Sequence, residues 1–361
     1  MNKIHFNLRK GIYPYRTGGM EIFNYYIIKN LAIFYTISYS AYLPLNFKTG
    51  KFHKLRNLRP SAIFEPLQLL FFLLKHKDIK TVIYSFSLDS WIAWWLYTII
   101  QKKTKIDYVV VIHYGKNPSL KHKKILRRFF LSAKKVIAVS KDIKMKYDAL
   151  YGINCEICFP LVPFKKSNLS KSELRVKYNI PQNVNVISMI GSLKKLKNPL
   201  TLLNSLLLFN NDTLNIYKPY ILYAGDGNMR KELEKFSLEH KLTQYVKFLG
   251  VIPKEQINEI FELSDLYVIS SDFEGTSVSL LEAMFHKIPI IASKVQGIKE
   301  TVRENVDCLM FHVNDAKMLK SCICKLLTDN DLKNQLVENA YNQYEKYYKY
   351  SDILSYYKNI L

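Results

Sequence analysis

The sequence predicts an α/β protein with two doubly wound parallel sheets, and three observations lead to this prediction. The chain has 361 residues, more than one ordinary domain needs. Short apolar runs alternate from end to end with amphipathic segments of helical length, which is the pattern of parallel sheets covered by helices. Prolines, serines and lysines break this alternation at residues 160–173, where we expect the linker between two domains.

The apolar runs give the expected strands in chain order. In the first half these are residues 4–8, 33–38, 81–86, 107–113 and 136–139, and in the second half residues 184–190, 219–224, 246–249, 266–270, 289–292 and 308–311. We expect helices between them, with a first domain over residues 1–165, a second over residues 166–340, and C-terminal helices in residues 341–361 that pack back toward the first domain. Ligands of doubly wound sheets bind outside the carboxyl ends of the strands, so we expect the site in a central cleft between the domains.

The positive charge is concentrated in the first domain. The whole chain carries a net charge of +23, and residues 1–166 hold 29 Lys and Arg against 8 Asp and Glu, whereas the rest is nearly neutral. A charge that only keeps a protein soluble would usually be spread more evenly. We therefore expect this half to face something anionic, such as a membrane leaflet, an acidic glycan or a nucleic acid. No aromatic-basic recognition motif is evident, so a nucleic-acid partner is not expected.

The remaining composition indicates a cytoplasmic protein that does not cross a bilayer. The first residues lack the apolar core of an export signal, and the most apolar segments, residues 67–74 and 91–100, are shorter than the roughly 20 residues that a membrane span needs. The five cysteines include the pair Cys155 and Cys158, but further ligands at metal spacing are missing. We therefore expect buried thiols in a reducing compartment and no metal site.

One segment in the second half combines a helix start with two acidic residues. The sequence SDFEGTSVSLLEAM, residues 271–284, follows an apolar run and reads as a strand-to-helix turn capped by Thr276 or Ser277. Free backbone N–H groups at a helix start suit a phosphate. Glu274 precedes this position and Glu282 lies further inside the helix, so the spacing suits a ligand with an anionic centre and hydroxyl groups at both ends. A sugar nucleotide fits this description, and a capped helix with a salt-bridged glutamate is the alternative.

The order of motifs around this segment resembles the family-four retaining glycosyltransferases of the GT-B fold. The second half contains VISMIGSLKKLKNPLTLL, YILYAGDGNMRKELE, VKFLGVIPKEQINEIFELSDLYVISS, EGTSVSLLEAMFHKIPIIAS and GIKETV, and the first half contains GGME, VVVIHYG and VIAVSKDI. The resemblance covers nearly the whole chain and is strongest over residues 184–304. It implies two Rossmann-like domains that face a central cleft, and the Glu-x7-Glu pair of Glu274 and Glu282 is the hallmark of the family.

The resemblance also implies roles for individual residues. Glu274 would hold hydroxyl groups of the donor sugar and favour the positive charge that develops there, and Glu282 would hold the ribose. His113, at the end of an expected strand, would approach the donor sugar, which makes Glu274 and His113 the expected catalytic residues. Further contacts with the nucleotide sugar would come from the glycine loop of the first domain and from the strand-to-helix turn, that is, from Gly18, Gly19, Gly275, Thr276 and Ser277.

A lysine in the first loop of the second domain completes the expected donor site. Lys197 matches the family's lysine that contacts the donor diphosphate, and a surface lysine is the alternative. Ser192 stands where the family usually has an arginine. Either Lys194 or Lys195 then supplies the second positive charge, or the donor binds more weakly, with Ser192 still expected beside the donor.

The basic first half also contains a candidate membrane-facing segment. In SLKHKKILRRFFLSAKK, residues 119–135, apolar residues recur at helical spacing among lysines and arginines. A basic amphipathic helix of this kind can lie on anionic lipid. A helix packed on its own sheet, with a solvated basic face, is the alternative. The residues expected to face the membrane are Lys123, Lys124, Arg127, Arg128, Phe129 and Phe130.

These features and the resemblance together imply a retaining, metal-independent hexosyltransferase that needs no cofactor. It would move a sugar from a UDP- or GDP-sugar to a glycan or lipid-linked acceptor in the biosynthesis of a surface polysaccharide or glycolipid, such as capsule or lipopolysaccharide. We expect it to be a peripheral protein on the cytoplasmic face of an anionic inner membrane. The alternatives are a non-catalytic anion- or membrane-binding protein that retains the fold, and a GT-B-type sugar-nucleotide epimerase.

Overall fold

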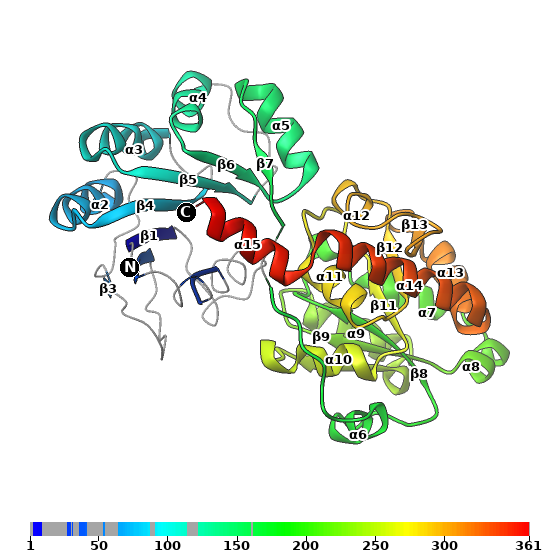
Figure 1. The fold of residues 1–361 in the computed structure, drawn as a ribbon. Helices are drawn as coiled ribbons and strands as arrows, with labels where there is room; N and C mark the ends of the chain where they lie inside the picture. The colour runs from blue at the N-terminus through cyan, green and yellow to red at the C-terminus, as the bar shows by residue number, and fades with distance from the viewer. Residues whose placement is uncertain are drawn as a thin grey trace. The chain divides into compact units, whose positions relative to one another are not determined.

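The chain forms two compact units, each built on one parallel sheet with helices around it (Figure 1). The first unit comprises Met1–Pro163 and Tyr350–Leu361, and the second comprises Phe164–Lys349. The predicted α/β class with two doubly wound parallel sheets is therefore confirmed. The computed structural model describes residues 3–8, 27–29, 31, 36–41, 53–54, 64–86, 91–113, 122–159 and 162–360.

Within the described residues, the first sheet has seven parallel strands in the order β3-β2-β1-β4-β5-β6-β7. They are β1 Lys3–Leu8, β2 Thr36–Ala41, β3 His53–Lys54, β4 Ile79–Phe86, β5 Asp107–Ile112, β6 Lys135–Ala138 and β7 Glu156–Ile157. The helices of this unit are α2 Phe64–Lys75, α3 Trp91–Thr104, α4 Lys123–Leu131, α5 Lys141–Tyr151 and α15 Tyr350–Ile360. Buried residues run almost without interruption along β4 and β5, as in the central strands of a parallel sheet covered on both faces.

Three details of the first sheet differ from the expected strands. The strand expected at residues 33–38 begins later, at Thr36. Two edge strands, β3 and β7, were not expected, because each has two residues and so offers no apolar run.

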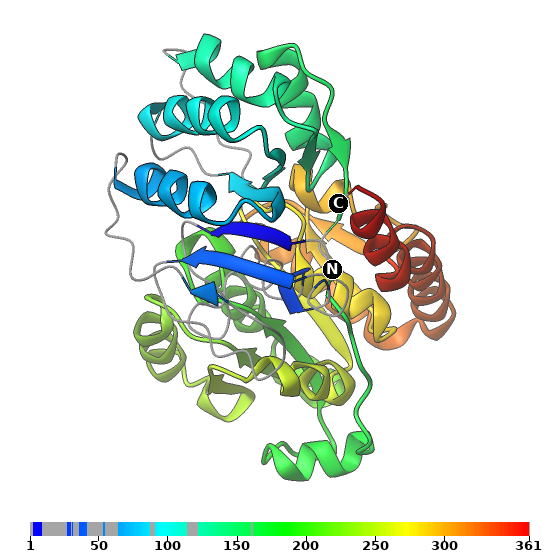
Figure 2. The ribbon, with the colours of Figure 1, turned by 60° about the vertical axis from the view of Figure 1, so that its left-hand side comes forward.

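Helices α2, α3, α4 and α5 follow one another as a row, in which each packs beside the next (Figure 1, Figure 2).

The expectation that the phenylalanines of helix α4 face a membrane is wrong. Phe129 and Phe130 are only 0% and 2% exposed. Their rings lie 5.2 Å from the ring of Tyr108 and 5.1 Å from that of Phe86, measured between centroids, within the core of the unit. The apolar side of the helix therefore packs on its own sheet, which was the alternative reading. The basic residues of the same helix are exposed, namely Lys123, Lys124, Arg127 and Arg128.

The C-terminal helix α15 belongs to the first unit. Residues 341–349 are part of the second unit, so the return to the first begins at Tyr350, later than the expected boundary. Three residues of α15 are buried in the core of the first unit: Ile353, Tyr357 and Ile360. Among the described residues, no helix combines the length and the apolarity that a bilayer crossing needs. All five cysteines are free thiols. Four of them are buried, as expected, and Cys324 is half-buried.

The second unit is described throughout, and its sheet has six parallel strands in the order β10-β9-β8-β11-β12-β13. These strands are β8 Asn185–Ile190, β9 Pro219–Ala224, β10 Val246–Gly250, β11 Leu266–Ile269, β12 Ile290–Ser293 and β13 Leu309–Phe311. The helices are α6 Lys171–Lys177, α7 Leu200–Leu207, α8 Asn211–Tyr217, α9 Arg230–Glu239, α10 Ile257–Leu263, α11 Val278–Phe285, α12 Gln296–Lys299, α13 Ala316–Thr328 and α14 Asn330–Tyr347. Short 3₁₀ turns are η2 Lys195–Lys197, η3 Thr243–Tyr245 and η4 Lys254–Gln256.

The strand order of this second sheet reverses between β8 and β11. The chain adds β9 and β10 on one side of β8, and then β11, β12 and β13 on the other. At such a switch point, the connections that leave the two neighbouring strands diverge and open a crevice at their carboxyl ends, where ligands of these folds bind. The segments that hold Lys197 and Glu274 follow β8 and β11, so both segments start at this point.

Candidate functional site

The two segments at the switch point are locked to each other by hydrogen bonds. Ser270, the residue after β11, is fully buried. Its hydroxyl lies 3.0 Å from the carbonyl oxygen of Lys197 and 2.8 Å from that of Asn198, to which it can donate. Asn198 ends η2 with a positive φ of 48°, a turn that brings the chain back toward the sheet. The position of Lys197 is therefore fixed by the neighbouring strand as well as by its own loop.

Lys197 and Glu274 meet at this point. The Nζ of Lys197 forms an ion pair with the Oε2 of Glu274. The hydroxyl of Ser271 donates to the same carboxylate oxygen at 3.0 Å. Neither side chain is fully buried. The pair places a positive and a negative group side by side at the edge of the sheet where a ligand of this fold is expected.

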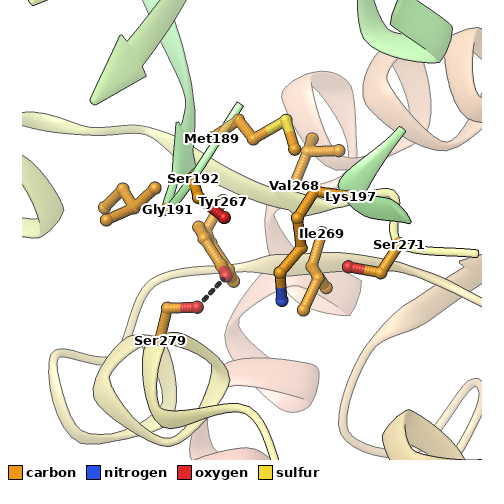
Figure 3. Close-up of a pocket in the computed structure, with 10 residues that line it drawn as sticks. Met189, Gly191, Ser192, Lys197, Tyr267, Val268, Ile269, Ser271 and Ser279 are labelled. Carbon is orange, nitrogen blue, oxygen red and sulfur yellow. Dashed lines mark hydrogen bonds between the residues drawn. The ribbon is translucent and has the colours of Figure 1, made fainter. Parts of the chain in front are cut away.

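A small pocket lies beside the pair (Figure 3). It has a volume of about 230 Å³, including space open to solvent. Figure 3 shows Lys197 and the hydroxyl of Ser271 on its wall, and the Tyr267 hydroxyl donates to Ser279 Oγ at 2.8 Å. Ser192, at the position where the family that the sequence resembles usually has an arginine, also lines the pocket. The full lining consists of Met189, Ile190, Gly191, Ser192, Lys197, Tyr267, Val268, Ile269, Ser271 and Ser279.

The strand-to-helix turn after β11 is held by a cap and by a close backbone contact. Ser277, and not Thr276, is the N-cap of α11, and its side chain accepts a hydrogen bond from the backbone N–H of Leu280. Gly297 in α12 lies directly against the turn. A Cβ added to Gly297 would lie 2.0 Å from the carbonyl oxygen of Glu274 and 2.5 Å from that of Gly275. Only glycine fits there, so α12 fixes the backbone of Glu274.

This contact predicts that Gly297→Ala destabilises the second unit and displaces Glu274. Overpacking of this kind typically costs about 1 to 3 kcal/mol, since backbone atoms must move. We expect the midpoint of thermal unfolding to fall by several degrees, on the order of 2–4 °C for each kcal/mol. Gly275→Ala is the matched control for stability, because a Cβ there would meet no atom within 4 Å. Equal melting of both variants, measured by circular dichroism, would contradict the assigned contact.

Glu282 lies in the interior of the second unit. Its side chain is 5% exposed, and its Oε2 lies 2.6 Å from the Nζ of Lys254, the first residue of η4. Burial raises the pKa of the Glu282 carboxyl, and the charge and hydrogen bond of Lys254 act in the opposite direction. The ammonium of Lys254 also lies 5.5 Å from the ring centroid of Phe164. The second glutamate of the motif is therefore a buried carboxylate that is already paired with a lysine.

His113 follows β5 directly in the first unit. Its Nε2 atom is buried although the residue as a whole is half-buried. Burial lowers the pKa of the imidazole to about 3, so the ring is neutral near neutral pH. A neutral ring can donate or accept a hydrogen bond without carrying charge. Its approach to a donor sugar stays a prediction, and Gly18 and Gly19 lie outside the described residues.

The structure adds residues to the site that the sequence pattern did not single out. Lys254 lies 28 positions before its partner Glu282, and Gly297 lies 23 positions after Glu274. Neither separation is a recognisable local spacing, because the contacts connect different βα units. Gly225 makes a contact between two loops: a Cβ on it would lie 1.8 Å from the carbonyl oxygen of Gly191. The turn after β9 therefore supports the loop after β8 on which Ser192 is carried.

Comparisons with known proteins agree with this fold. The family model of "Glycosyl transferases group 1" matches residues 170–343. The Campylobacter jejuni enzyme "GalNAc-alpha-(1->4)-GalNAc-alpha-(1->3)-diNAcBac-PP-undecaprenol alpha-1,4-N-acetyl-D-galactosaminyltransferase" is 29% identical over 157 residues, which are 43% of this chain and 42% of that enzyme. The match thus spans less than half of that relative's length.

Two further similarities extend over nearly the whole chain. An uncharacterised glycosyltransferase of Methanocaldococcus jannaschii is 23% identical over 350 residues, 91% of this chain and 90% of the relative. The crystal structure of Anabaena HepE in complex with UDP-glucose has a TM-score of 0.77 at 19% identity and covers 99% of this chain and 100% of its own. The second unit therefore matches the group 1 glycosyl transferases, and the chain as a whole has the GT-B fold.

Proposed function

We propose that this protein transfers a sugar from a nucleotide sugar to a glycan or lipid-linked acceptor. The observation that carries the proposal is the Lys197–Glu274 pair at the switch point of the second sheet. A fixed ammonium can offset the charge that grows on a departing diphosphate, and a carboxylate beside it can hold sugar hydroxyl groups and favour a positive anomeric carbon. The Campylobacter relative is named for transfer to an undecaprenol-linked glycan, and HepE was crystallised with UDP-glucose, which supports both substrate classes.

In the proposed reaction the transfer retains the configuration of the sugar. The bond between the anomeric carbon and the phosphate oxygen breaks, and the electron pair leaves with the nucleoside diphosphate. The acceptor hydroxyl attacks the anomeric carbon from the same face, and its proton passes to the departing phosphate oxygen. Lys197 stabilises the diphosphate, Glu274 stabilises the sugar cation, Glu282 binds the ribose hydroxyls, and His113 as a neutral ring orients a sugar hydroxyl.

We further propose a donor, an acceptor and a cellular location for this enzyme. The donor is a UDP- or GDP-hexose, and neither a cofactor nor a metal ion takes part. The acceptor belongs to a surface polysaccharide or glycolipid, such as capsule or lipopolysaccharide. The enzyme works as a peripheral protein on the cytoplasmic face of the membrane, where lipid-linked acceptors are accessible. An unchanged rate in excess EDTA is the expected result for a metal-independent transfer.

One experiment with two readouts tests the proposal. Thermal-shift titrations with UDP-, GDP-, ADP- and TDP-sugars identify the donor class, and release of nucleoside diphosphate is then measured with and without an added lipid-linked acceptor. Release that depends on the acceptor supports transfer. Binding without release would indicate the non-catalytic protein, and acceptor-independent conversion of the sugar nucleotide would indicate the epimerase.

A pH dependence of donor binding is expected from Glu282. Because the pKa of its carboxyl is raised, Glu282 takes up a proton at a higher pH than an exposed glutamate does. Its charge-assisted hydrogen bonds to the ribose are then lost, so affinity for the nucleoside diphosphate should fall as the pH is lowered. Glu282→Ala should weaken binding at every pH, with a smaller effect on turnover at saturating donor. Calorimetric titration over a pH series measures this affinity.

The partner of Glu282 provides a sharper test. Lys254→Met removes the positive charge that lowers the pKa of Glu282, so the loss of affinity should begin at a higher pH than in the wild type. Lys254→Arg should restore the wild-type profile. The matched control is Lys287→Met, which breaks a more exposed lysine–glutamate pair in the same unit, the pair with Glu338. A pH profile in Lys254→Met that coincides with that of Lys287→Met would remove Lys254 from this role.

A further inference from the structure

Three neighbouring helices of the first unit carry exposed apolar side chains among basic ones. Helix α2 packs beside α3, and α3 packs beside α4 (Figure 1, Figure 2). Among the side chains of these helices that the structure describes, the most exposed apolar ones are Phe71 at 70%, Leu131 at 53% and Trp95 at 49%. We call the outward surface of α2, α3 and α4 the outer helical face. Its exposed apolar residues are Leu67, Phe71, Leu74, Trp95 and Leu131.

Helix α2 is apolar on two opposite sides. Leu69, Phe72 and Leu73 are buried in the core of the first unit. Leu67, Phe71 and Leu74 lie four and three positions apart, so they form one stripe along the opposite side, and all three are exposed. A helix that only covers a sheet would carry polar residues on this side. The outward stripe, which we call the α2 ridge, therefore indicates a partner with an apolar interior.

The charge on the same three helices has one sign. Helices α2, α3 and α4 contain seven lysines and arginines and one acidic residue, Glu65. The basic residues are all exposed: Lys75, Lys102, Lys103, Lys123, Lys124, Arg127 and Arg128. Within α2 itself, Lys75 follows Leu74 directly at the end of the ridge. The partner should therefore be anionic next to its apolar region.

We propose that the outer helical face lies on an anionic lipid bilayer, with the α2 ridge inserted at the boundary between headgroups and acyl chains. Lysine and arginine stems can extend to the phosphate level while apolar side chains enter the lipid. An acidic glycan would explain the basic residues but would leave the α2 ridge without an apolar surface to contact. The choice of a bilayer rests on the proposed function, since a lipid-linked acceptor is held there. In this arrangement most apolar anchors come from α2 and α3, and α4 contributes most of the charge and Leu131.

The test compares two surface variants with a matched control on vesicles. The ridge variant carries Leu67→Ser, Phe71→Ser and Leu74→Ser. The control carries Ile216→Ser and Leu238→Ser, whose side chains are each 69% exposed in the second unit. Co-sedimentation is measured with vesicles of phosphatidylcholine alone and of phosphatidylcholine mixed with phosphatidylglycerol. Folding of every variant is checked by thermal melting and by binding of the nucleotide sugar.

The wild type and the control should bind the anionic vesicles equally and the neutral vesicles weakly. The ridge variant should lose on the order of tenfold in partitioning for each large side chain that no longer enters lipid. A charge variant with Lys123, Lys124, Arg127 and Arg128 changed to Glu should lose the preference for anionic vesicles, and wild-type binding should weaken as salt rises. All three tryptophans lie in α3, so brominated lipid should quench wild-type fluorescence in the bound state.

Each contrary result overturns the proposal in a recognisable way. Wild-type protein that ignores anionic vesicles at low salt would exclude the bilayer. A charge variant that fails to bind beside a ridge variant that binds normally would assign the basic residues to an acidic glycan. A wild type that self-associates, with a monomeric ridge variant and no vesicle binding, would make the ridge an interface between copies. Vesicle binding without nucleotide-sugar binding would overturn the proposed function and leave this surface in place.

Discussion

Lys197→Ala is expected to slow turnover at saturating donor by roughly a hundredfold, about 3 kcal/mol in the activation free energy. Ser270 fixes the backbone of Lys197, and Glu274 holds its ammonium, so the positive charge needs little rearrangement when negative charge grows on the diphosphate. When Lys197 is removed, the negative charge that grows on the diphosphate is no longer offset at that position. The turnover number is measured from release of nucleoside diphosphate with acceptor present.

The neighbouring lysines supply the control for this prediction. Lys194 and Lys195 lie in the same loop and are exposed, so their replacement by alanine should cost less than that of Lys197. If either one stands in for the arginine that Ser192 replaces, its loss should appear mainly in the KM of the donor. A severe defect in Lys194→Ala together with normal turnover in Lys197→Ala would mean that the lysine assignment is out of register.

The ion pair with Glu274 makes the effect of Lys197 depend on its partner. Without Lys197, the carboxylate of Glu274 remains close to the bound diphosphate and is no longer neutralised. The single variant should therefore lose donor affinity in addition to turnover. The double variant Lys197→Ala and Glu274→Gln should lose less than the product of the two single losses, since the repulsive charge is gone as well. A double-mutant cycle on kcat/KM measures this coupling.

Glu274→Ala is the second change with a large expected effect, a loss of roughly a hundredfold to a thousandfold in turnover. The contact between its carboxylate and the donor sugar strengthens as the anomeric carbon becomes positive, so the loss should fall on kcat and should leave the KM of the donor nearly unchanged. Glu282→Ala should show the opposite division. Initial rates over a range of donor concentrations separate the two constants.

The isosteric variant Glu274→Gln distinguishes charge from shape. It keeps hydrogen bonding to sugar hydroxyls and removes the negative charge, so a loss close to that of Glu274→Ala would assign the effect to electrostatic stabilisation. A loss confined to Glu274→Ala would assign it to positioning of the sugar. Wild-type kinetics in both variants would remove Glu274 from the reaction and with it the main support for the proposed function.

The sequence by itself determined the fold class, most of the strands, and the placement of Glu274 and Glu282 around one strand-to-helix turn. Periodicity carries this information because a strand such as β9 or β5 is a continuous apolar run, and its neighbours along the chain are helices of regular amphipathic pattern. The capping position of Ser277 followed from local chemistry in the same way, as one of two hydroxyl residues before the helix. Such signals lie within a few residues of one another.

The tertiary structure decided which side of each element is buried and which distant groups meet. Helix α4 has the pattern of a lipid-binding helix, but its phenylalanines fill the core because the sheet offers them a closer apolar surface. The pairing of Lys197 with Glu274 and of Lys254 with Glu282 depends on the strand order at the switch point and on the packing of separate βα units. A sequence pattern records what each segment prefers, whereas these contacts arise only when segments far apart in the chain are brought together.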